Sequence, residues 1–256
     1  MTLVAQDVTV RQLTSHADLL AAQRLFESIW QGDVPPVTAE LLRAMAKAGN
    51  YVAGAFDGDL LVGACAGFCS PPAARSLHSH IAGVAAGTRG RAVGLALKLD
   101  QRQWALDRDI TEISWTFDPL VRRNAHFNLT KLAAEATEYL PDFYGDMHDG
   151  INAGAESDRL LVTWRITDPV VPRTVVVEGS VALGISDGLP VLGNPSGATV
   201  LVAVPPDVET LRTTNPAAAR EWRHAVREVL GSLLAEGARV TGFDRSGWYA
   251  VERNTQ

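Results

Sequence analysis

Apolar and polar positions along the first 108 residues predict alternating strands and helices joined by short connections. Residues 8–13 (VTVRQL) alternate apolar and polar side chains, which is typical of a strand with one buried face. Residues 16–30 carry apolar side chains at helical spacing and follow a Thr14-Ser15 pair that can cap a helix. The other elements predicted here are a helix from Thr38 to about Gly49, hairpin strands at 51–56 and 60–68 around Asp57-Gly58-Asp59, a strand at 77–86 and a helix at 95–108.

The second half of the chain continues this alternation. Residues 109–117 predict a strand, which Asp118-Pro119 ends because proline lacks a donor and restricts the residue before it. Residues 145–154 predict a polar, glycine-rich loop, and residues 167–174 a linker. The other predicted elements are a short helix at 125–134 capped by Asn124, strands at 139–144, 159–166, 174–177, 199–204, 240–243 and 248–251, and a long helix that starts at Asn215-Pro216 and ends at Gly237.

A turn rich in glycine and arginine joins the strand at 77–86 to the helix at 95–108. It reads Gly87-Thr88-Arg89-Gly90-Arg91-Ala92-Val93-Gly94. The first N–H groups of a helix lack an internal partner and carry the positive end of its dipole, so such a turn suits a phosphate. The turn has neither the Gly-Lys-Ser/Thr of a P-loop nor a G-x-G-x-x-G fingerprint. A plain strand-to-helix packing turn is the alternative interpretation.

The spacing Arg89-x-x-Ala92-x-Gly94 resembles the pyrophosphate loop of the GCN5-related N-acetyltransferases (GNAT), which follows R/Q-x-x-G-x-G/A. Alanine stands here in place of the first glycine. The predicted order of elements is similar to the N-terminal half of that fold. The region from about Ser79 to Trp164 also resembles a little-characterised subgroup of predicted GNAT acetyltransferases, through W-T-F-D-P-L, N-A-x-F-N-L-x-K-L, Y-G-x-M and a D-R pair.

The resemblance implies an α/β (α+β) GNAT fold, in which a mixed central sheet is splayed between its fourth and fifth strands and flanked by helices. We expect residues 1–167 to form the acyl-CoA-binding domain. Residues 168–256 are expected to form a C-terminal αβ lobe that resembles a partial GNAT repeat. The apolar stripe of its long helix predicts packing on the first domain or on a partner subunit.

The resemblance also implies where an acyl-CoA binds, with acetyl-CoA as the default donor. The pantetheine arm is expected along Ala82, Gly83 and Val84, at the end of the central strand. Asn124 and Phe127 are further expected CoA contacts, although Asn124 is equally suited to be a helix cap. The pyrophosphate is expected on the backbone of Arg89, Gly90, Arg91, Ala92, Val93, Gly94 and Leu95.

Proton transfer in this superfamily often uses a tyrosine on the helix after the fifth strand. The equivalent position is Lys131, so a water, Tyr144 or His126 are the alternative acids, or no acid is needed. His80 is a candidate base or a core histidine. Asp118 is a candidate base or simply the end of a strand.

Five residues are expected to shape the acceptor pocket. In an alternative interpretation, Arg159 pairs with Asp158 or Asp149 and only holds the loop in place. The five residues are Trp115, Asp149, Asn152, Asp158 and Arg159.

Composition narrows the choice of partners. Of the 256 residues, 46% are hydrophobic and 20% charged, which is typical of a globular protein, and the net charge of −6 argues against nucleic acid. Cys65 and Cys69 are too far apart in one strand to pair, which fits a reducing cytoplasm. We expect no membrane span and no leader peptide. The six histidines lack metal-ligand spacing, so no metal is expected.

These observations support three hypotheses of function. The first is an acyl-CoA-dependent N-acyltransferase that transfers acetyl from acetyl-CoA to a primary amine of a small molecule. The second is a non-catalytic acyl-CoA-binding protein, suggested by the missing tyrosine. The third is a GNAT-fold enzyme of other CoA chemistry, such as decarboxylation. A homodimer is left open.

Overall fold

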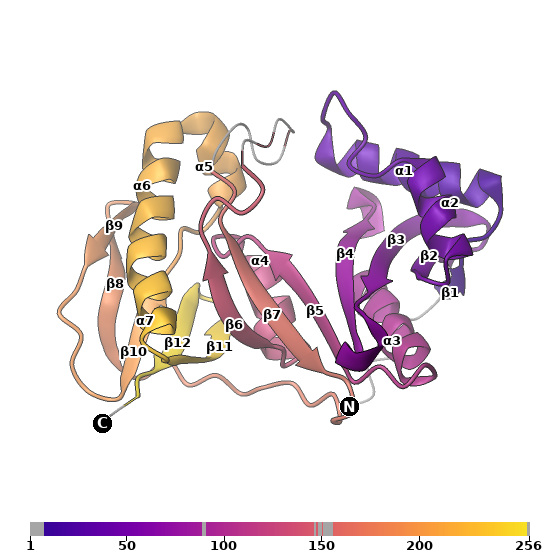
Figure 1. Ribbon diagram of the computed structural model, residues 1–256. Coiled ribbons are helices and arrows are strands. Elements are labelled where there is room, and N and C mark those ends of the chain that lie inside the picture. Colours follow the sequence, from indigo (N-terminus) through magenta and orange to yellow (C-terminus); the bar gives the residue numbers. More distant parts are fainter. Residues whose placement is uncertain (1–7, 89–90, 146, 148–149, 151–155, 255–256) are drawn as a thin grey trace. The chain divides into compact units, whose positions relative to one another are not determined.

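The computed structural model describes residues 8–88, 91–145, 147, 150 and 156–254 (Figure 1). The chain divides into two compact units, residues 1–114 and 115–256. This division falls inside strand β5 (Glu112–Phe117). The reason is that the residues after Ser114 pack with the C-terminal lobe, through contacts given below.

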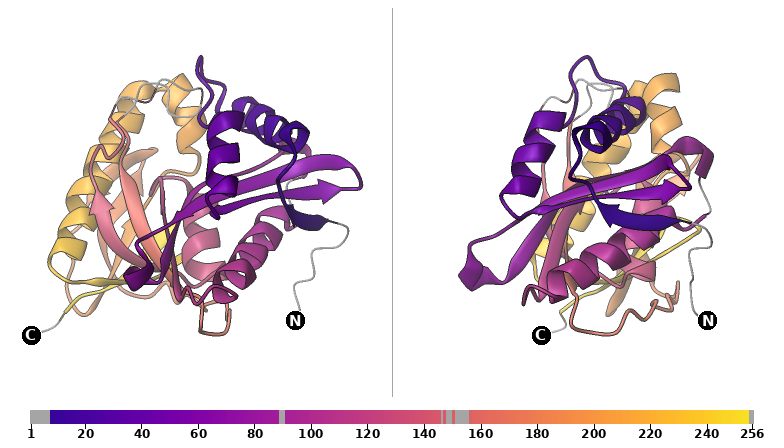
Figure 2. Two further views of the ribbon diagram at one scale, coloured as in Figure 1. Left: turned by 45° about the vertical axis from the view of Figure 1, so that its right-hand side comes forward. Right: turned by 90° about the vertical axis from the view of Figure 1, so that its right-hand side faces the viewer.

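The first unit contains strands in the order β1-β2-β3-β4, each antiparallel to its neighbour. Helices α1 and α2 lie on one face of these strands and α3 on the other (Figure 2). Every element predicted for this part is present, with ends shifted by two residues or fewer. The elements are β1 (Thr9–Gln12), α1 (His16–Trp30), α2 (Ala39–Lys47), β2 (Tyr51–Asp57), β3 (Leu60–Cys69), η1 (Pro72–Ala74), β4 (Ser76–Val84), η2 (Ala86–Thr88) and α3 (Val93–Leu106).

Capping side chains fix where the first two helices begin. Ser15 Oγ accepts a hydrogen bond from the Asp18 N–H at 3.1 Å, and Thr38 Oγ1 accepts one from the Leu41 N–H at 3.2 Å. The apolar faces of both helices pack on the sheet, and each large side chain buried there contributes about 1.5–3 kcal/mol. This core includes Leu19, Phe26, Leu42, Val52, Phe56 and Ile81.

Between two paired positions, strand β4 contains one residue more than its partner β3. Ala66 pairs with Ile81, whereas Phe68 pairs with His78, so β4 bulges between these two pairs. On its other side, β4 pairs in parallel with β5 at three positions, residues 76–78 against 112–114. The parallel register is therefore confined to the first residues of both strands, as the expected splay requires.

The second unit contains the end of β5, two further strands and a second sheet. The first sheet has the order β1-β2-β3-β4-β5-β7-β6, and the second has the order β11-β12-β10-β8-β9. The elements after β5 are α4 (Arg122–Ala125), η3 (His126–Lys131), β6 (Glu135–Leu140), β7 (Arg159–Arg165), β8 (Ser180–Ser186), β9 (Leu189–Leu192), β10 (Thr199–Ala203), α5 (Val208–Thr214), α6 (Pro216–Val226), η4 (Arg227–Gly231), α7 (Ser232–Ala235), β11 (Arg239–Asp244) and β12 (Trp248–Glu252).

The long C-terminal helix is present as predicted and is continuous through α6, η4 and α7 (Figure 1). Asn215 caps it, because Asn215 Oδ1 accepts a hydrogen bond from the Ala218 N–H at 3.1 Å. Gly237 follows its end with a φ of +84°, a left-handed conformation that suits glycine. The buried stripe of the helix, which packs against β6 and β9, consists of Ala218, Ala219, Trp222, Val226, Leu230 and Leu233.

Several details of the second unit differ from the prediction. The helix after β5 begins at Arg122, so Asn124 lies inside it and is not its cap. The strand expected at 139–144 lies at 135–140, and residues 174–177 form no strand. The β8–β9 hairpin was not predicted, although Asp187-Gly188 between its strands is a strong hairpin signal.

No helix among the described residues is both long and apolar enough to cross a membrane.

Candidate functional site

The turn after β4 leaves the first N–H groups of α3 without acceptors in the helix. The first helical bond runs from the Ala96 N–H to the Ala92 carbonyl at 3.0 Å. The N–H groups of Val93, Gly94 and Leu95 precede this bond. Ala92 has a left-handed φ of 58° and forms no side-chain cap. These expected phosphate contacts therefore lie at a helix N-terminus whose donors are not used by a capping side chain.

The backbone of this turn is open to close approach. A Cβ added at Gly94 would meet only Val84 Cγ2, at 3.8 Å, and one added at Gly87 would meet nothing within 4 Å. At the end of β4, Ala82 is exposed and Val84 is half-buried, whereas Gly83 lies beneath α1. Two other expected contacts, Arg89 and Gly90, lie outside the described residues.

Arg91 is directed toward the hairpin between β2 and β3. Its Nη1 lies 2.6 Å from Asp57 Oδ2. This hydrogen bond, with the charge of Arg91, lowers the pKa of Asp57. The pair joins the turn before α3 to the β2–β3 turn, so Arg91 helps to hold the turn as well as offering positive charge.

His78 and His80 lie beside the bulge of β4 and form an aromatic cluster with Phe68. The ring centroid of Phe68 is 5.2 Å from that of His78 and 5.8 Å from that of His80. His78 Nδ1 lies 3.4 Å from the Ser114 hydroxyl. Burial lowers the pKa of both histidines, although His80 keeps an exposed edge. A neutral imidazole at pH 7 can accept a proton.

Two candidate acids have different surroundings. The Tyr144 hydroxyl lies 3.0 Å from Thr116 Oγ1, and its side chain is 41% exposed. His126 Nε2 accepts a hydrogen bond from Arg245 Nε at 3.3 Å, and burial, with the charges of Arg245 and Lys131, lowers its pKa. Tyr144 is thus the more accessible proton donor of the two.

Asp118, at the end of β5, is buried in an ion-pair cluster with two arginines of the C-terminal lobe. Its carboxylate binds Arg223 of α6 through two hydrogen bonds of 2.8 and 2.7 Å and also binds Arg212 of α5. Burial alone would raise the pKa of Asp118, but Arg223 and then Arg212 hold it well below its usual range. This geometry favours a role in fixing the strand end over one in proton transfer.

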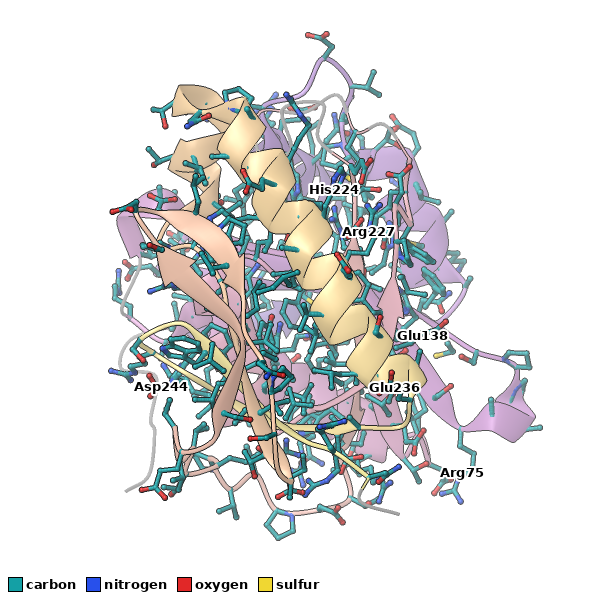
Figure 3. The ribbon with its side chains drawn as sticks, turned by 90° about the vertical axis from the view of Figure 1, so that its left-hand side faces the viewer. Arg75, Glu138, His224, Arg227, Glu236 and Asp244 are labelled. Carbon is teal, nitrogen blue, oxygen red and sulfur yellow. The ribbon has the colours of Figure 1, made fainter. Side chains whose placement is uncertain are left out.

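Asp158 is the centre of a second buried cluster. Its carboxylate accepts hydrogen bonds from the Tyr139 hydroxyl at 2.7 Å, from Arg227 Nε at 2.9 Å and from the Asp142 N–H at 3.0 Å. Arg227, labelled on the long helix in Figure 3, comes from the η4 turn. Burial would raise the pKa of Asp158, but the hydrogen bonds from Arg227, the Asp142 N–H and Tyr139 together lower that pKa. Asp158 therefore fastens the long helix to the start of β7.

The remaining predicted site residues are dispersed. Trp115 is buried against Trp164, with the ring centroids 6.3 Å apart and the planes at 89°. Asn124 lies within α4 and Phe127 within η3, and both are half-buried. Asp149 and Asn152 lie outside the described residues.

Sequence reasoning missed a buried polar cluster under β4. Lys98 Nζ donates to Ser79 Oγ at 2.8 Å and to Gln101 Oε1 at 3.2 Å, and Cys65 Sγ lies 3.6 Å from Ser79 Oγ. Burial lowers the pKa of Lys98 to about 8. Lys98 lies three residues after Leu95 and three before Gln101, which puts it on the buried stripe of α3.

The arginines that bind Asp118 and Asp158 were also missed. Arg223 follows Trp222 on the buried face of α6, where an arginine signals a buried ion pair. The partner carboxylates lie about seventy to a hundred residues earlier in the chain. Among the described residues, no group of three or more His, Cys, Asp or Glu side chains is placed to hold a metal ion.

No protein-family model matches the chain, and no curated protein matches it. Solved structures do match. The ribosomal-protein-S5-alanine acetyltransferase of Vibrio fischeri matches with a TM-score of 0.52 at 13% identity, covering 65% of this chain and 97% of its own. The yncA protein of Salmonella typhimurium, solved with its cofactor acetyl-CoA, has a TM-score of 0.52 at 15% identity. The match covers 66% of this chain and 100% of the yncA chain. A ribosomal-protein-alanine N-acetyltransferase of Brucella melitensis has a TM-score of 0.51 at 17% identity. The match covers 60% of this chain and 98% of the Brucella chain.

At these identities the likeness establishes the fold. The chain has the fold of the GNAT acetyltransferases, as the sequence pattern predicted. The matches span nearly the whole length of each neighbour but leave part of this chain outside the shared fold.

Proposed function

We propose that this protein is an acyl-CoA-dependent N-acyltransferase that transfers an acetyl group to the primary amine of a small molecule. The observation that carries the proposal is the turn from β4 to α3 on a GNAT fold. There the N–H groups of Val93, Gly94 and Leu95 have no helical acceptor, and a Cβ placed at Gly94 would meet, among the described residues, only Val84 Cγ2 at 3.8 Å. Acetyl-CoA in one neighbour supports the choice of donor.

The reaction needs one base and one proton for the leaving group. The ammonium of the acceptor first loses a proton, and the amine then attacks the thioester carbonyl carbon. A C–N bond forms, the C–S bond breaks, and the CoA thiolate takes up a proton. His80 is proposed as the base, because its imidazole has a lowered pKa and an exposed edge. Tyr144 is proposed as the acid because its hydroxyl is accessible.

A protein N-terminus is a second acceptor class to be tested. Neighbours named for acetylating alanine of ribosomal proteins support including it. The predicted preference is for a small-molecule amine. Turnover of peptides at their amino terminus, without turnover of any small-molecule amine, would contradict that part of the proposal.

Thermal unfolding with CoA tests cofactor binding directly. A ligand that binds only the folded chain, at a hundredfold excess over its dissociation constant, raises the free energy of unfolding by about 2.7 kcal/mol. Gly94→Val should remove most of this gain, because its side chain would cover the N–H groups of α3. The space around Gly94 accommodates a Cβ, so the variant should fold.

Gln103→Val, on an exposed position of the same helix, is the matched control for the lower helix propensity of valine. It should keep the full response to CoA. Wild-type melting that is unchanged by saturating CoA would contradict the proposal. Strong CoA binding with no thiol release on a broad panel of amines would instead favour a non-catalytic CoA-binding protein.

A further inference from the structure

The side chain of Arg159, at the start of β7, is buried among neutral acceptors. It is 8% exposed. Its Nη1 donates to the backbone carbonyl of Asp158 at 2.9 Å, and its Nη2 points to Met147 Sδ at 3.0 Å. A thioether is a weak acceptor, so among the described residues half of the guanidinium fork has no strong partner. The guanidinium also lies over the Tyr144 ring, with its Cζ 5.2 Å from the ring centroid.

The buried carboxylates Asp158 and Asp118 are already bound by other arginines. Asp158 binds Arg227 through its side chain, and Asp118 binds Arg212 and Arg223. Within the described part of the chain, no carboxylate forms an ion pair with Arg159. Burying an arginine without a counter-charge is costly, which makes this position a place where an anion from outside would be stabilised.

The tyrosine ring under the same guanidinium is partly exposed. Tyr144, whose ring Arg159 covers, has its hydroxyl 3.0 Å from Thr116 Oγ1. Tyr144 is 41% exposed, so a small molecule can reach this position from solvent. A guanidinium fork matches the planar geometry and hydrogen-bonding needs of a carboxylate.

We propose that Arg159 binds the carboxylate of the amine acceptor, so that the acceptor is an amino acid or another amine that carries a carboxylate. This inference rests on the proposed N-acyltransferase function and names its substrate class.

The first test compares matched acceptors on the wild-type protein. The L- and D-amino acids are assayed one by one with acetyl-CoA, each against its own carboxamide, with free thiol release as the readout. Because a site built to bind a charged group rejects an analogue that lacks it, we expect kcat/KM for the best acid to exceed that of its amide by about a hundredfold or more. Equal use of acids and amides would overturn the inference.

The second test uses variants of the arginine. Arg159→Gln should lower kcat/KM for the acid by about a hundredfold while changing that for the amide less than threefold, and Arg159→Lys should recover part of the loss. Arg165→Gln, at an exposed position of the same strand, is the matched control. An equal loss with acid and amide would assign Arg159 a structural role only.

A binding measurement separates failure of this inference from failure of the proposed function. Calorimetric titration of the same acids and amides, with and without saturating CoA, should show acid-selective binding that Arg159→Gln abolishes. CoA stabilisation of that variant should equal that of the wild type, which would exclude a phosphate of CoA as the anion. Acid-selective binding without turnover would contradict the acyltransferase function but support the role of Arg159. Binding of neither acid nor amide, with a normal CoA response, would overturn the role of Arg159 alone.

Discussion

Arg223 and Asp118 are 105 residues apart in the chain and are joined by two parallel hydrogen bonds, from Nη1 to Oδ1 at 2.8 Å and from Nη2 to Oδ2 at 2.7 Å. Both side chains are buried. The pair ties the end of a strand in the GNAT-like part to the long helix of the C-terminal lobe. An aspartate that looks catalytic from its position at the end of β5 is therefore a structural anchor.

Asp118→Asn should destabilise the protein strongly. Removing one partner of a buried ion pair costs about 3–5 kcal/mol, because it leaves the other charge uncompensated, and here two arginines lose their carboxylate. Urea unfolding at pH 7 measures the loss. Glu209→Gln, which breaks the exposed pair with Arg123, is the control and should cost less than about 1 kcal/mol. Comparable losses in the two variants would contradict the assignment of Asp118 as an anchor.

The same aspartate should give a defined pH dependence. The pKa of Asp118 in the folded protein is held below its ordinary value by Arg223 and Arg212, against the opposing effect of burial. Its stabilisation is therefore complete above the unfolded pKa, about 3.9, and is lost as the pH falls from there toward the folded value. From pH 6 down to pH 3, the free energy of unfolding should fall more for the wild type than for Asp118→Asn. Parallel curves would show that Asp118 does not carry this dependence.

Two tyrosines near the start of β7 should separate turnover from stability. Tyr144→Phe removes an accessible hydroxyl, and if that hydroxyl protonates the thiolate, kcat should fall about a hundredfold with CoA binding intact. Tyr139→Phe removes the buried hydrogen bond to Asp158 and should cost about 1–3 kcal/mol of unfolding free energy. Thiol release and urea unfolding are measured on both variants. A change in kcat of less than threefold for Tyr144→Phe would favour a water as the acid.

Thr130, in the η3 turn, should be essential to the packing of the lobe. Its Oγ1 donates to the Phe243 carbonyl at 2.7 Å and accepts from the Phe243 N–H at 3.2 Å. Thr130→Val keeps the shape but leaves both buried backbone groups without a partner, which should cost about 2 kcal/mol or more. Thr137→Val, at an exposed position of β6, is the control. The unfolding free energy of both variants is measured by chemical denaturation. Equal losses for Thr130→Val and Thr137→Val would contradict the prediction.

Lys98 should make stability rise with pH above neutrality. Its pKa is about 8 in the folded protein, lowered by burial, against about 10.4 in an unfolded chain. Between these values the unfolded chain holds more protons, so the contribution of Lys98 to the free energy of unfolding increases with pH, by about 1 kcal/mol from pH 7 to pH 9. Lys98→Met should lack this increase, whereas the exposed Lys47→Met should retain it. The quantity to measure is the difference in unfolding free energy from the wild type at each pH.

The elements of the first unit could be predicted almost completely because short stretches of sequence determine where each of them begins and ends. Ser15 and Thr38 cap their helices, Asp57-Gly58-Asp59 marks the hairpin, and the periods of apolar residues match each element. The residue types of the proposed CoA turn were also recognisable, since they are consecutive. These features depend on neighbours within a few residues, which sequence reasoning handles well.

The chemistry of the second unit depends on contacts that are distant in sequence. Nothing near Asp118 indicates that Arg212 and Arg223 bind it, and nothing near Arg159 indicates that Arg227 takes the carboxylate of Asp158. The start of the helix at Arg122 was also misplaced, because a suitable cap at Asn124 was preferred over the preceding residues. Only the folded arrangement distinguishes an aspartate that anchors from one that reacts.

The sequence separation of these anchors has a consequence for the order of folding during synthesis. The Tyr249 hydroxyl donates to the Pro119 carbonyl, 130 residues earlier, and β12 pairs with both β10 and β11. The second unit therefore cannot close its core until the last strand has left the ribosome, whereas every strand pairing among β1 to β4 is complete by residue 84. Until then, β5 to β7 have no lobe to cover them, and this nascent intermediate is the state of the protein most exposed to aggregation and most dependent on chaperones.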